Sequence, residues 1–254
     1  MTDSQAPGDE RWIYVVLGLF SILLLAFLAL WAVQSGLLAP LARTTTISGR
    51  VLYDGQAPTP AKLLVVADRD VCGQIDHFDD RLQVSPNGGI EYAVVSLQRV
   101  EGGRPLESMG SQFILDQRRC AYLPHLLLVP VGHPVRILNS DDVFHNIHTY
   151  STDNRPVNIA HPHTEGPLEL TLDTPERVSV RCDIHGWMSS WIVAVDHPYH
   201  VVTDPGGGFV LADIPPGTYT LQCWQELLGE LTAQVTVGRG DHLEFDFSYP
   251  PIAQ

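Results

Sequence analysis

The chain has 254 residues, which is long enough for two domains and a membrane anchor. It carries 15 Lys and Arg against 29 Asp and Glu, a formal net charge of −14. This charge argues against nucleic-acid binding, because phosphate backbones attract basic proteins. Apolar residues make up 44% of the sequence, an ordinary proportion, but they are unevenly distributed.

The first apolar segment predicts a single transmembrane helix over residues 12–34. Residues 12–33 contain no charged side chain, and as a helix they would be about 33 Å long, enough to cross a bilayer core. Trp12, Tyr14 and Trp31 would lie near the two interfaces. We interpret the segment as a retained signal anchor. A cleaved signal peptide and a buried core helix are the alternatives.

Residues 35–43 form a predicted linker, and beyond them helical periodicity is nearly absent. Short runs rich in β-branched and aromatic residues recur instead, separated by Gly- and Pro-rich turns. They include residues 44–53, 63–67, 92–97, 126–129, 135–138, 177–181, 191–195, 218–223, 231–237 and 242–247. Many short strands with such turns predict an all-β fold of two β-sandwich domains after the helix.

The C-terminal part resembles the carboxypeptidase regulatory-like (transthyretin-like) domain. The resemblance rests on a turn, a Gly-Gly-Phe209 strand and then Pro-Pro-Gly-Thr-Tyr219. Such domains usually open with Ile-x-Gly-x-Val and an Asp-Gly turn, which here lie far upstream, at Ile47–Val51 and Asp54. The resemblance therefore implies a discontinuous domain, residues 44–103 and 197–250, with residues 104–196 inserted. Two consecutive smaller β units are the alternative.

The inserted segment contains a pattern of metal-ligand residue types. Cys182, His185 and Met188 are spaced so that one loop can hold all three, and His145-Asn146 follows a predicted strand upstream. One thiolate, two imidazoles and a weak thioether accommodate both Cu(I) and Cu(II) with little rearrangement. Asn146 could hydrogen-bond across to the ligand loop and stiffen it.

This pattern resembles the cupredoxin family, most closely amicyanin and plastocyanin, over about residues 112–196. The resemblance implies a type 1 copper site with His145, Cys182 and His185 as equatorial ligands and Met188 as the axial ligand. His148 would be a neighbour that does not bind the metal. The sequence departs from the family where Asp183-Ile184 replaces the common Thr-Pro and where Trp187 precedes Met188. Taken singly, each ligand residue also fits a structural role.

The remaining Cys and His residues receive structural interpretations. Cys72 and Cys120 lie in loop-like sequence and could form a disulfide in an oxidising compartment, while Cys223 is expected as a buried thiol. His161 and His163 are expected on a polar surface loop rather than in a second metal site. Four others have no ligand-like spacing: His125, His133, His197 and His200.

Two functions follow. In the first, the protein is a tethered one-electron carrier in which electrons pass through an exposed edge of a ligand histidine, with Phe144, Trp187 and Trp191 as an apolar docking patch. Its partners would be an integral membrane electron-transfer complex or a soluble redox protein such as a cytochrome c. In the second, it is a metal-free accessory subunit of a membrane complex, respiratory or photosynthetic. Copper delivery is a weaker third possibility.

Neither function makes the protein an enzyme, since the sequence contains no hydrolase or nucleotide-binding signature. The positive-inside rule does not decide the orientation, but the site chemistry favours export. We therefore expect a single-pass protein in contact with the lipid of a bacterial inner membrane. Residues 1–11 would stay in the cytoplasm and the β domains would lie in the periplasm.

Overall fold

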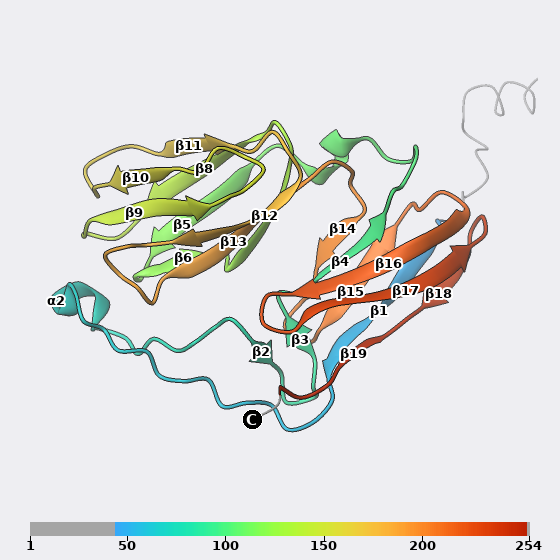
Figure 1. Cartoon of the computed structure of the whole chain (residues 1–254), viewed down its shortest axis with the longest axis horizontal. Coiled ribbons are helices and arrows are strands. Elements are labelled where there is room, and N and C mark those ends of the chain that lie inside the picture. The colour runs from blue at the N-terminus through green and yellow to red at the C-terminus, as the bar shows by residue number, and fades with distance from the viewer. Residues whose placement is uncertain (1–43, 253–254) are drawn as a thin grey trace, which may run out of the picture. The chain divides into compact units, whose positions relative to one another are not determined.

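The computed structural model describes residues 44–252. The predicted transmembrane helix at residues 12–34 lies outside them. Between residues 44 and 252, no helix has the length and apolar character needed to cross a membrane. This described part is nearly all β and forms two β-sandwiches, which we call the outer and the inner sandwich (Figure 1).

The outer sandwich is built from both ends of the described chain. Its strands are β1 (Thr46–Tyr53), β4 (Val94–Gln98), β14 (His200–Val202), β15 (Gly208–Ala212), β16 (Gly217–Gln225), β17 (Gly229–Val237), β18 (His242–Glu244) and β19 (Phe247–Tyr249). One sheet has the order β15-β1-β18, with β19 pairing farther along β1, and the other has the order β14-β4-β16-β17. Both sheets therefore combine strands from before and after the inner sandwich.

The opening motif of β1 fits its place in this sheet. Alternation turns Ile47, Val51 and Tyr53 into the core, where they are buried. Gly49 lies where the chain crosses from β18 to β19, and a Cβ there would lie 1.8 Å from the carbonyl oxygen of Phe245. The close backbone approach explains why a glycine occupies this strand position.

The inner sandwich occupies the middle of the chain. Its strands are β5 (Phe113–Arg118), β6 (Ala121–Leu123), β7 (Leu126–Pro130), β8 (Pro134–Asn139), β9 (His145–Tyr150), β10 (Asn158–His161), β11 (Leu168–Thr171), β12 (Glu176–Arg181) and β13 (Ser189–Val195). They form sheets of order β10-β9-β12-β13-β7 and β11-β8-β5-β6. Leu115, Ile137, Ile147 and Ile192 are fully or almost fully buried in the core between them. A short 3-10 turn, η1 (Leu106–Met109), precedes β5.

The segment between β1 and β4 leaves the outer sandwich and returns. It contains the helix α2 (Arg69–Cys72) and a small hairpin of β2 (Gln83–Val84) and β3 (Ile90–Glu91). The prediction of a strand at residues 63–67 is wrong, because nearby only Lys62 forms a bridge, to Phe78. This bridge and a hydrogen bond from Leu63 N–H to the His77 carbonyl close residues 61–79 into a lobe.

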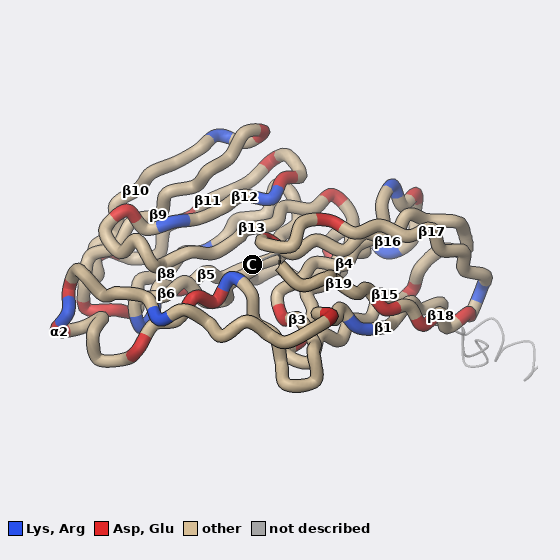
Figure 2. The backbone as a smooth tube through the Cα atoms, turned by 60° about the horizontal axis from the view of Figure 1, so that its bottom comes forward, with Lys and Arg blue, Asp and Glu red and all other residues tan. Residues whose placement is uncertain are grey.

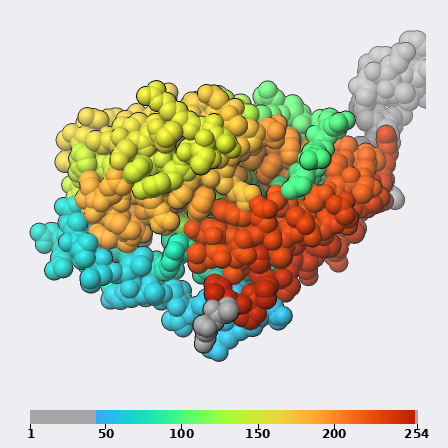
Figure 3. Space-filling view, in the orientation of Figure 1, coloured from blue at the N-terminus to red at the C-terminus, as the bar shows by residue number. Residues whose placement is uncertain are grey.

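The lobe packs on the inner sandwich rather than on the outer one (Figures 1 and 3). A disulfide joins Cys72 of α2 to Cys120, between β5 and β6, with an S–S distance of 2.00 Å. Both cysteines belong to the inner hydrophobic core. The predicted boundaries, which assigned all of residues 44–103 to the outer sandwich, do not anticipate this crossing.

The two sandwiches meet through aromatic and charged side chains. The rings of Trp191 and Trp224 lie 5.0 Å apart, and the Arg177 guanidinium lies over Trp224. Trp191 also donates a hydrogen bond from Nε1 to Glu226, which pairs with His125. Elsewhere acidic and basic residues are interspersed along the described chain (Figure 2).

Candidate metal centre

Strand pairing brings the predicted ligands together at one end of the inner sandwich. His145 is the first residue of β9, and Cys182 directly follows β12. These strands are antiparallel neighbours, with Arg181 opposite His148. Continuing that register places the loop after β12 beside the start of β9. His185 and Met188 lie on this loop, and the Met188 N–H donates to the His185 carbonyl at 2.8 Å.

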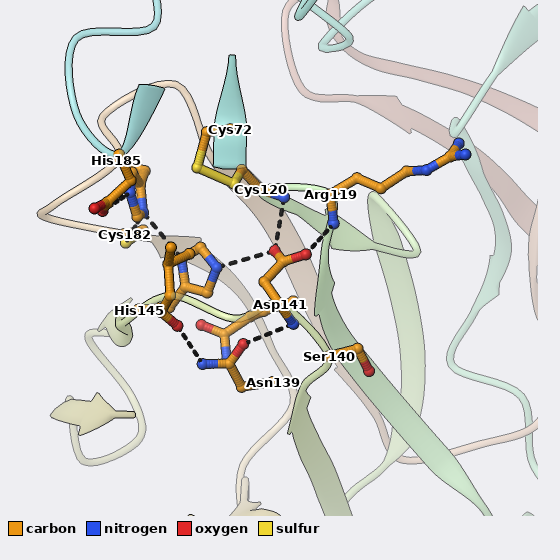
Figure 4. Close-up of polar contacts among 12 residues, drawn as sticks. Cys72, Arg119, Cys120, Asn139, Ser140, Asp141, His145, Cys182 and His185 are labelled. Carbon is orange, nitrogen blue, oxygen red and sulfur yellow. Dashed lines mark hydrogen bonds and ion pairs between the residues drawn. A yellow bond between two sulfur atoms is a disulfide. The ribbon is translucent and has the colours of Figure 1, made fainter. Parts of the chain in front are cut away.

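The donor atoms of three of these side chains form a compact buried group (Figure 4). Nδ1 of His145 lies 2.9 Å from Nδ1 of His185, which lies 3.7 Å from Sγ of Cys182. Metal–nitrogen bonds of about 2.0 Å and a metal–sulfur bond of about 2.3 Å place neighbouring donors about 3–4 Å apart. Met188, the fourth predicted ligand, is 2% exposed and packs in the same core.

The outer nitrogens of both imidazoles are paired with carboxylates. Nε2 of His145 lies 3.0 Å from Oδ2 of Asp141, and Nε2 of His185 lies 2.8 Å from Oδ2 of Asp68. Because an ionised carboxylate accepts hydrogen bonds only, each Nε2 carries a proton. The two Nδ1 atoms then face each other across 2.9 Å, a contact that is favourable when a proton or a metal cation lies between them. The donor set therefore fits a bound metal ion.

The surroundings favour ionised forms at the centre. Burial raises the pKa of the Cys182 thiol, but hydrogen bonds from His145 and His185 outweigh burial and lower the pKa to about 6. Burial also raises the pKa of Asp141, while its hydrogen bonds with His145 and with the backbone N–H groups of Cys120 and Arg119 lower it overall. A thiolate is the form of cysteine that binds metals.

Asn146 bridges β9 and the ligand loop. Its Oδ1 accepts a 2.7 Å hydrogen bond from the Asp183 N–H, and its Nδ2 donates to the Asp183 carboxylate at 3.1 Å. The backbone carbonyl of Asn146 accepts a hydrogen bond from the buried Tyr122 hydroxyl at 2.6 Å. The Asp183 carboxylate is exposed and pairs with His148, which lies outside the donor group.

The predicted docking patch is not a single surface. Phe144 is 43% exposed, but Trp187 is half-buried, with its ring 5.0 Å from that of His185 and its Nε1 bonded to the Cys120 carbonyl. Trp191 lies between the two sandwiches. His145 and His185 are both fully buried, so the prediction that a ligand histidine exposes an edge is wrong.

His161 also departs from the expectation of a polar surface loop. It ends β10, is fully buried, and its Nδ1 accepts a hydrogen bond from Gln117 Nε2 at 2.8 Å. His163 is exposed.

Sequence reasoning missed both carboxylates of the centre. Asp141 lies four residues before His145, so the Asn-Ser-Asp stretch before a candidate ligand was an available signal. Asp68 lies 117 residues before His185, and no motif connects the two.

No family model matches the chain, and no curated protein matches it. Solved structures do show similarity. The copper-containing nitrite reductase NirK from Thermus scotoductus SA-01 is 19% identical with a TM-score of 0.32, covering 34% of this chain and 23% of that one. A purple cupredoxin from Nitrosopumilus maritimus is 20% identical with a TM-score of 0.29, covering 33% of this chain and 100% of its own. A methionine-to-alanine mutant of amicyanin in the Cu(I) form is 17% identical with a TM-score of 0.30, covering 40% of this chain and 98% of that one.

Each of these similarities extends over two fifths of the chain or less. The interpretation of the centre therefore depends on the positions of its own donor atoms.

Proposed function

We propose that the protein is a copper-binding, one-electron carrier of the cupredoxin type. His145, Cys182 and His185 would be the equatorial ligands and Met188 the axial one. The observation that carries this proposal is the buried group of one thiol and two imidazole nitrogens whose lone pairs face a shared space. When bound, copper supplies a couple between Cu(I) and Cu(II).

The chain's own residues hold the donors in place. Asp141 and Asp68 keep the protons of His145 and His185 on Nε2, so that both Nδ1 atoms are free to bind. His145, Cys182 and His185 are 0–2% exposed, so bulk water does not reach these three donors. A rigid, dry site limits the rearrangement that accompanies a change of charge.

The same features argue against catalysis. All four proposed ligands come from the protein and are buried, which leaves no open position for a substrate. We therefore propose electron transfer without a bound substrate, with partners that are themselves redox proteins. These would be an integral membrane complex or a soluble carrier such as a cytochrome c.

We further propose that the protein acts in the periplasm, anchored to a bacterial inner membrane by residues 12–34. The disulfide between Cys72 and Cys120 supports an oxidising compartment, because such bonds are rare in reducing ones. Fusion of a phosphatase reporter to residue 254 would give high activity for export and low activity for a cytoplasmic location.

Bound metal and its spectrum test the copper site. The purified full-length chain should hold one copper and show an intense visible thiolate-to-Cu(II) band that disappears on reduction. Cys182→Ser should abolish the band. Cys223→Ser is the matched control, since Cys223 is the other buried free thiol of the described chain and lies in the outer core. Retention of the band in Cys182→Ser would contradict the proposal.

A metal-free accessory subunit of a membrane complex is the second candidate. The burial of His185 favours it, because a carrier normally exposes a route to its metal. Absence of copper after reconstitution, together with stable co-purification in a membrane complex, would establish this role instead.

A further inference from the structure

The lobe of residues 61–79 covers the edge of the metal centre that would otherwise face solvent. His185 is fully buried, and its Nε2 meets the carboxylate of Asp68 from this lobe. In sequence the lobe belongs to the segment that leaves the outer sandwich, yet its Asp68 contacts a site whose proposed ligands all lie in the inner sandwich.

Several contacts fix the lobe in this position. Its neck is closed by backbone hydrogen bonds of 2.8 Å, from Leu63 N–H to the His77 carbonyl and from Asp79 N–H to the Ala61 carbonyl. The disulfide at Cys72 joins its helix to the inner sandwich. A cavity of about 30 Å³, room for about one water molecule, lies between the lobe and the ligand loop.

The backbone of Asp68 is fixed in place by its own conformation and hydrogen bonds. Its backbone has φ 44° and ψ 46°, a left-handed conformation that non-glycine residues rarely adopt and that persists where the surroundings enforce it. The Cys72 and Val71 N–H groups bond to its carbonyl at 2.7 and 3.0 Å. The Asp68 side chain is 42% exposed, so Asp68 lies between solvent and the His185 side chain, which has no exposure of its own.

We propose that the lobe is a fixed cap on the metal centre and that Asp68 is the positioning residue through which it acts. The Asp68 carboxylate accepts the Nε2–H of His185, turns Nδ1 toward the other donors, and closes the imidazole edge to solvent and to direct contact with a partner. The proposal deepens the proposed function and depends on it for the metal, while the capping itself is a property of the metal-free chain.

Capping predicts that Asp68 controls chemical access to His185. In the metal-free full-length chain, diethyl pyrocarbonate should modify His185 slowly, since the reagent must wait for a local opening. Asp68→Ala should accelerate the modification about tenfold, because the side chain that covers the imidazole edge is then missing while the lobe stays in place. Peptide mass spectrometry measures the rate at each histidine. His145, buried behind the donor group, should stay slow in both proteins. An unchanged rate at His185 would overturn the proposal.

A charge-neutral variant separates capping from folding. Asp68→Asn keeps an acceptor oxygen and should keep His185 shielded, but it removes a negative charge that favours Cu(II). The ratio of Cu(I) to Cu(II) at a fixed potential should rise about fivefold, equivalent to about +40 mV at 59 mV per tenfold change. Asp70→Asn is the matched control, since Asp70 lies in the same lobe, is exposed and bonds to no ligand.

Equal shifts in the two asparagine variants would overturn the positioning role, because Asp68 would then act as an ordinary surface charge. A wild-type chain that binds no copper would refute the proposed function instead. The modification rates at His185 would still decide whether the lobe is a cap.

Discussion

His125 joins three parts of the described chain, and its replacement tests how the sandwiches are held together. The side chain is 3% exposed and pairs through Nε2 with Glu226, which is 6% exposed. Its Nδ1 lies 3.3 Å from Asp80, an ion pair without hydrogen-bond geometry. Burial lowers the pKa of His125, but the two carboxylates outweigh burial and raise it to about 9.

The sign of the pH dependence follows from this raised pKa. The imidazolium is stabilised in the folded state, so the contribution is fully present below the unfolded pKa of about 6.5 and is lost as the pH rises to about 9. At about 1.4 kcal/mol per pKa unit, the rise of the His125 pKa from 6.5 to about 9 corresponds to about 3 kcal/mol of folding stability. Screening of Asp80, which is 38% exposed, lowers the expectation to about 2 kcal/mol.

Urea unfolding of wild type and His125→Gln at several pH values measures this contribution. The difference in unfolding free energy between the two proteins should be about 2 kcal/mol smaller at pH 9.5 than at pH 6, because the charge-dependent part of the cost disappears. The packing and the Glu226 contact that the substitution removes add a part that does not change with pH. The two proteins must be compared because ionisation of Cys182, whose pKa is lowered, also raises the unfolding free energy over part of the same pH range. His133→Gln, at a half-buried site with one backbone contact, is the control. A difference that stays constant from pH 6 to 9.5 would refute the reasoning.

Three further predictions concern stability. Replacing both Cys72 and Cys120 by alanine opens a loop closed over 48 residues and should cost about 4 kcal/mol in a denaturant titration; a cost near zero would contradict a constraint on the unfolded chain. Gly49→Ala should cost about 3 kcal/mol or more in the same assay, because the new Cβ meets the Phe245 carbonyl, and wild-type stability would show that β1 lies elsewhere. Glu176 has a pKa lowered to about 2: burial raises it, and hydrogen bonds from residues 151–154 outweigh that effect. Glu176→Gln should therefore lower the Tm at pH 7, with the difference vanishing as the pH falls from about 4.5 to 2, and a constant difference would contradict this.

The sequence predicted the local part of the centre because spacing determines it. Cys182, His185 and Met188 lie on one short loop after a strand, and a loop of that length keeps their side chains together. His145 was predictable because it lies on the neighbouring strand. The start of β9 and the end of β12 lie at the same end of the sheet. The β1 motif was also predictable from local sequence. Its glycine, Gly49, allows the backbone at Phe245 to pass close to β1.

The sequence did not predict the long-range contacts. The lobe has no helical or strand periodicity, and apart from the expected disulfide of Cys72 to Cys120 nothing in residues 61–79 indicates which sandwich it covers. No motif indicates that Asp68 meets His185. Trp191 lies on β13, whose residues are buried on both faces because the outer sandwich covers one of them. An apolar run of this kind does not distinguish a docking surface from an internal contact.

X-ray absorption at the copper edge of the reconstituted full-length chain tests the central claim most directly. The proposed centre predicts two nitrogen neighbours at about 2.0 Å and one sulfur at about 2.3 Å, the distances that imidazole and thiolate ligands give. The sulfur signal should disappear in Cys182→Ser and remain in Cys223→Ser. A spectrum with oxygen and nitrogen neighbours alone in the wild-type chain would contradict the proposed copper site.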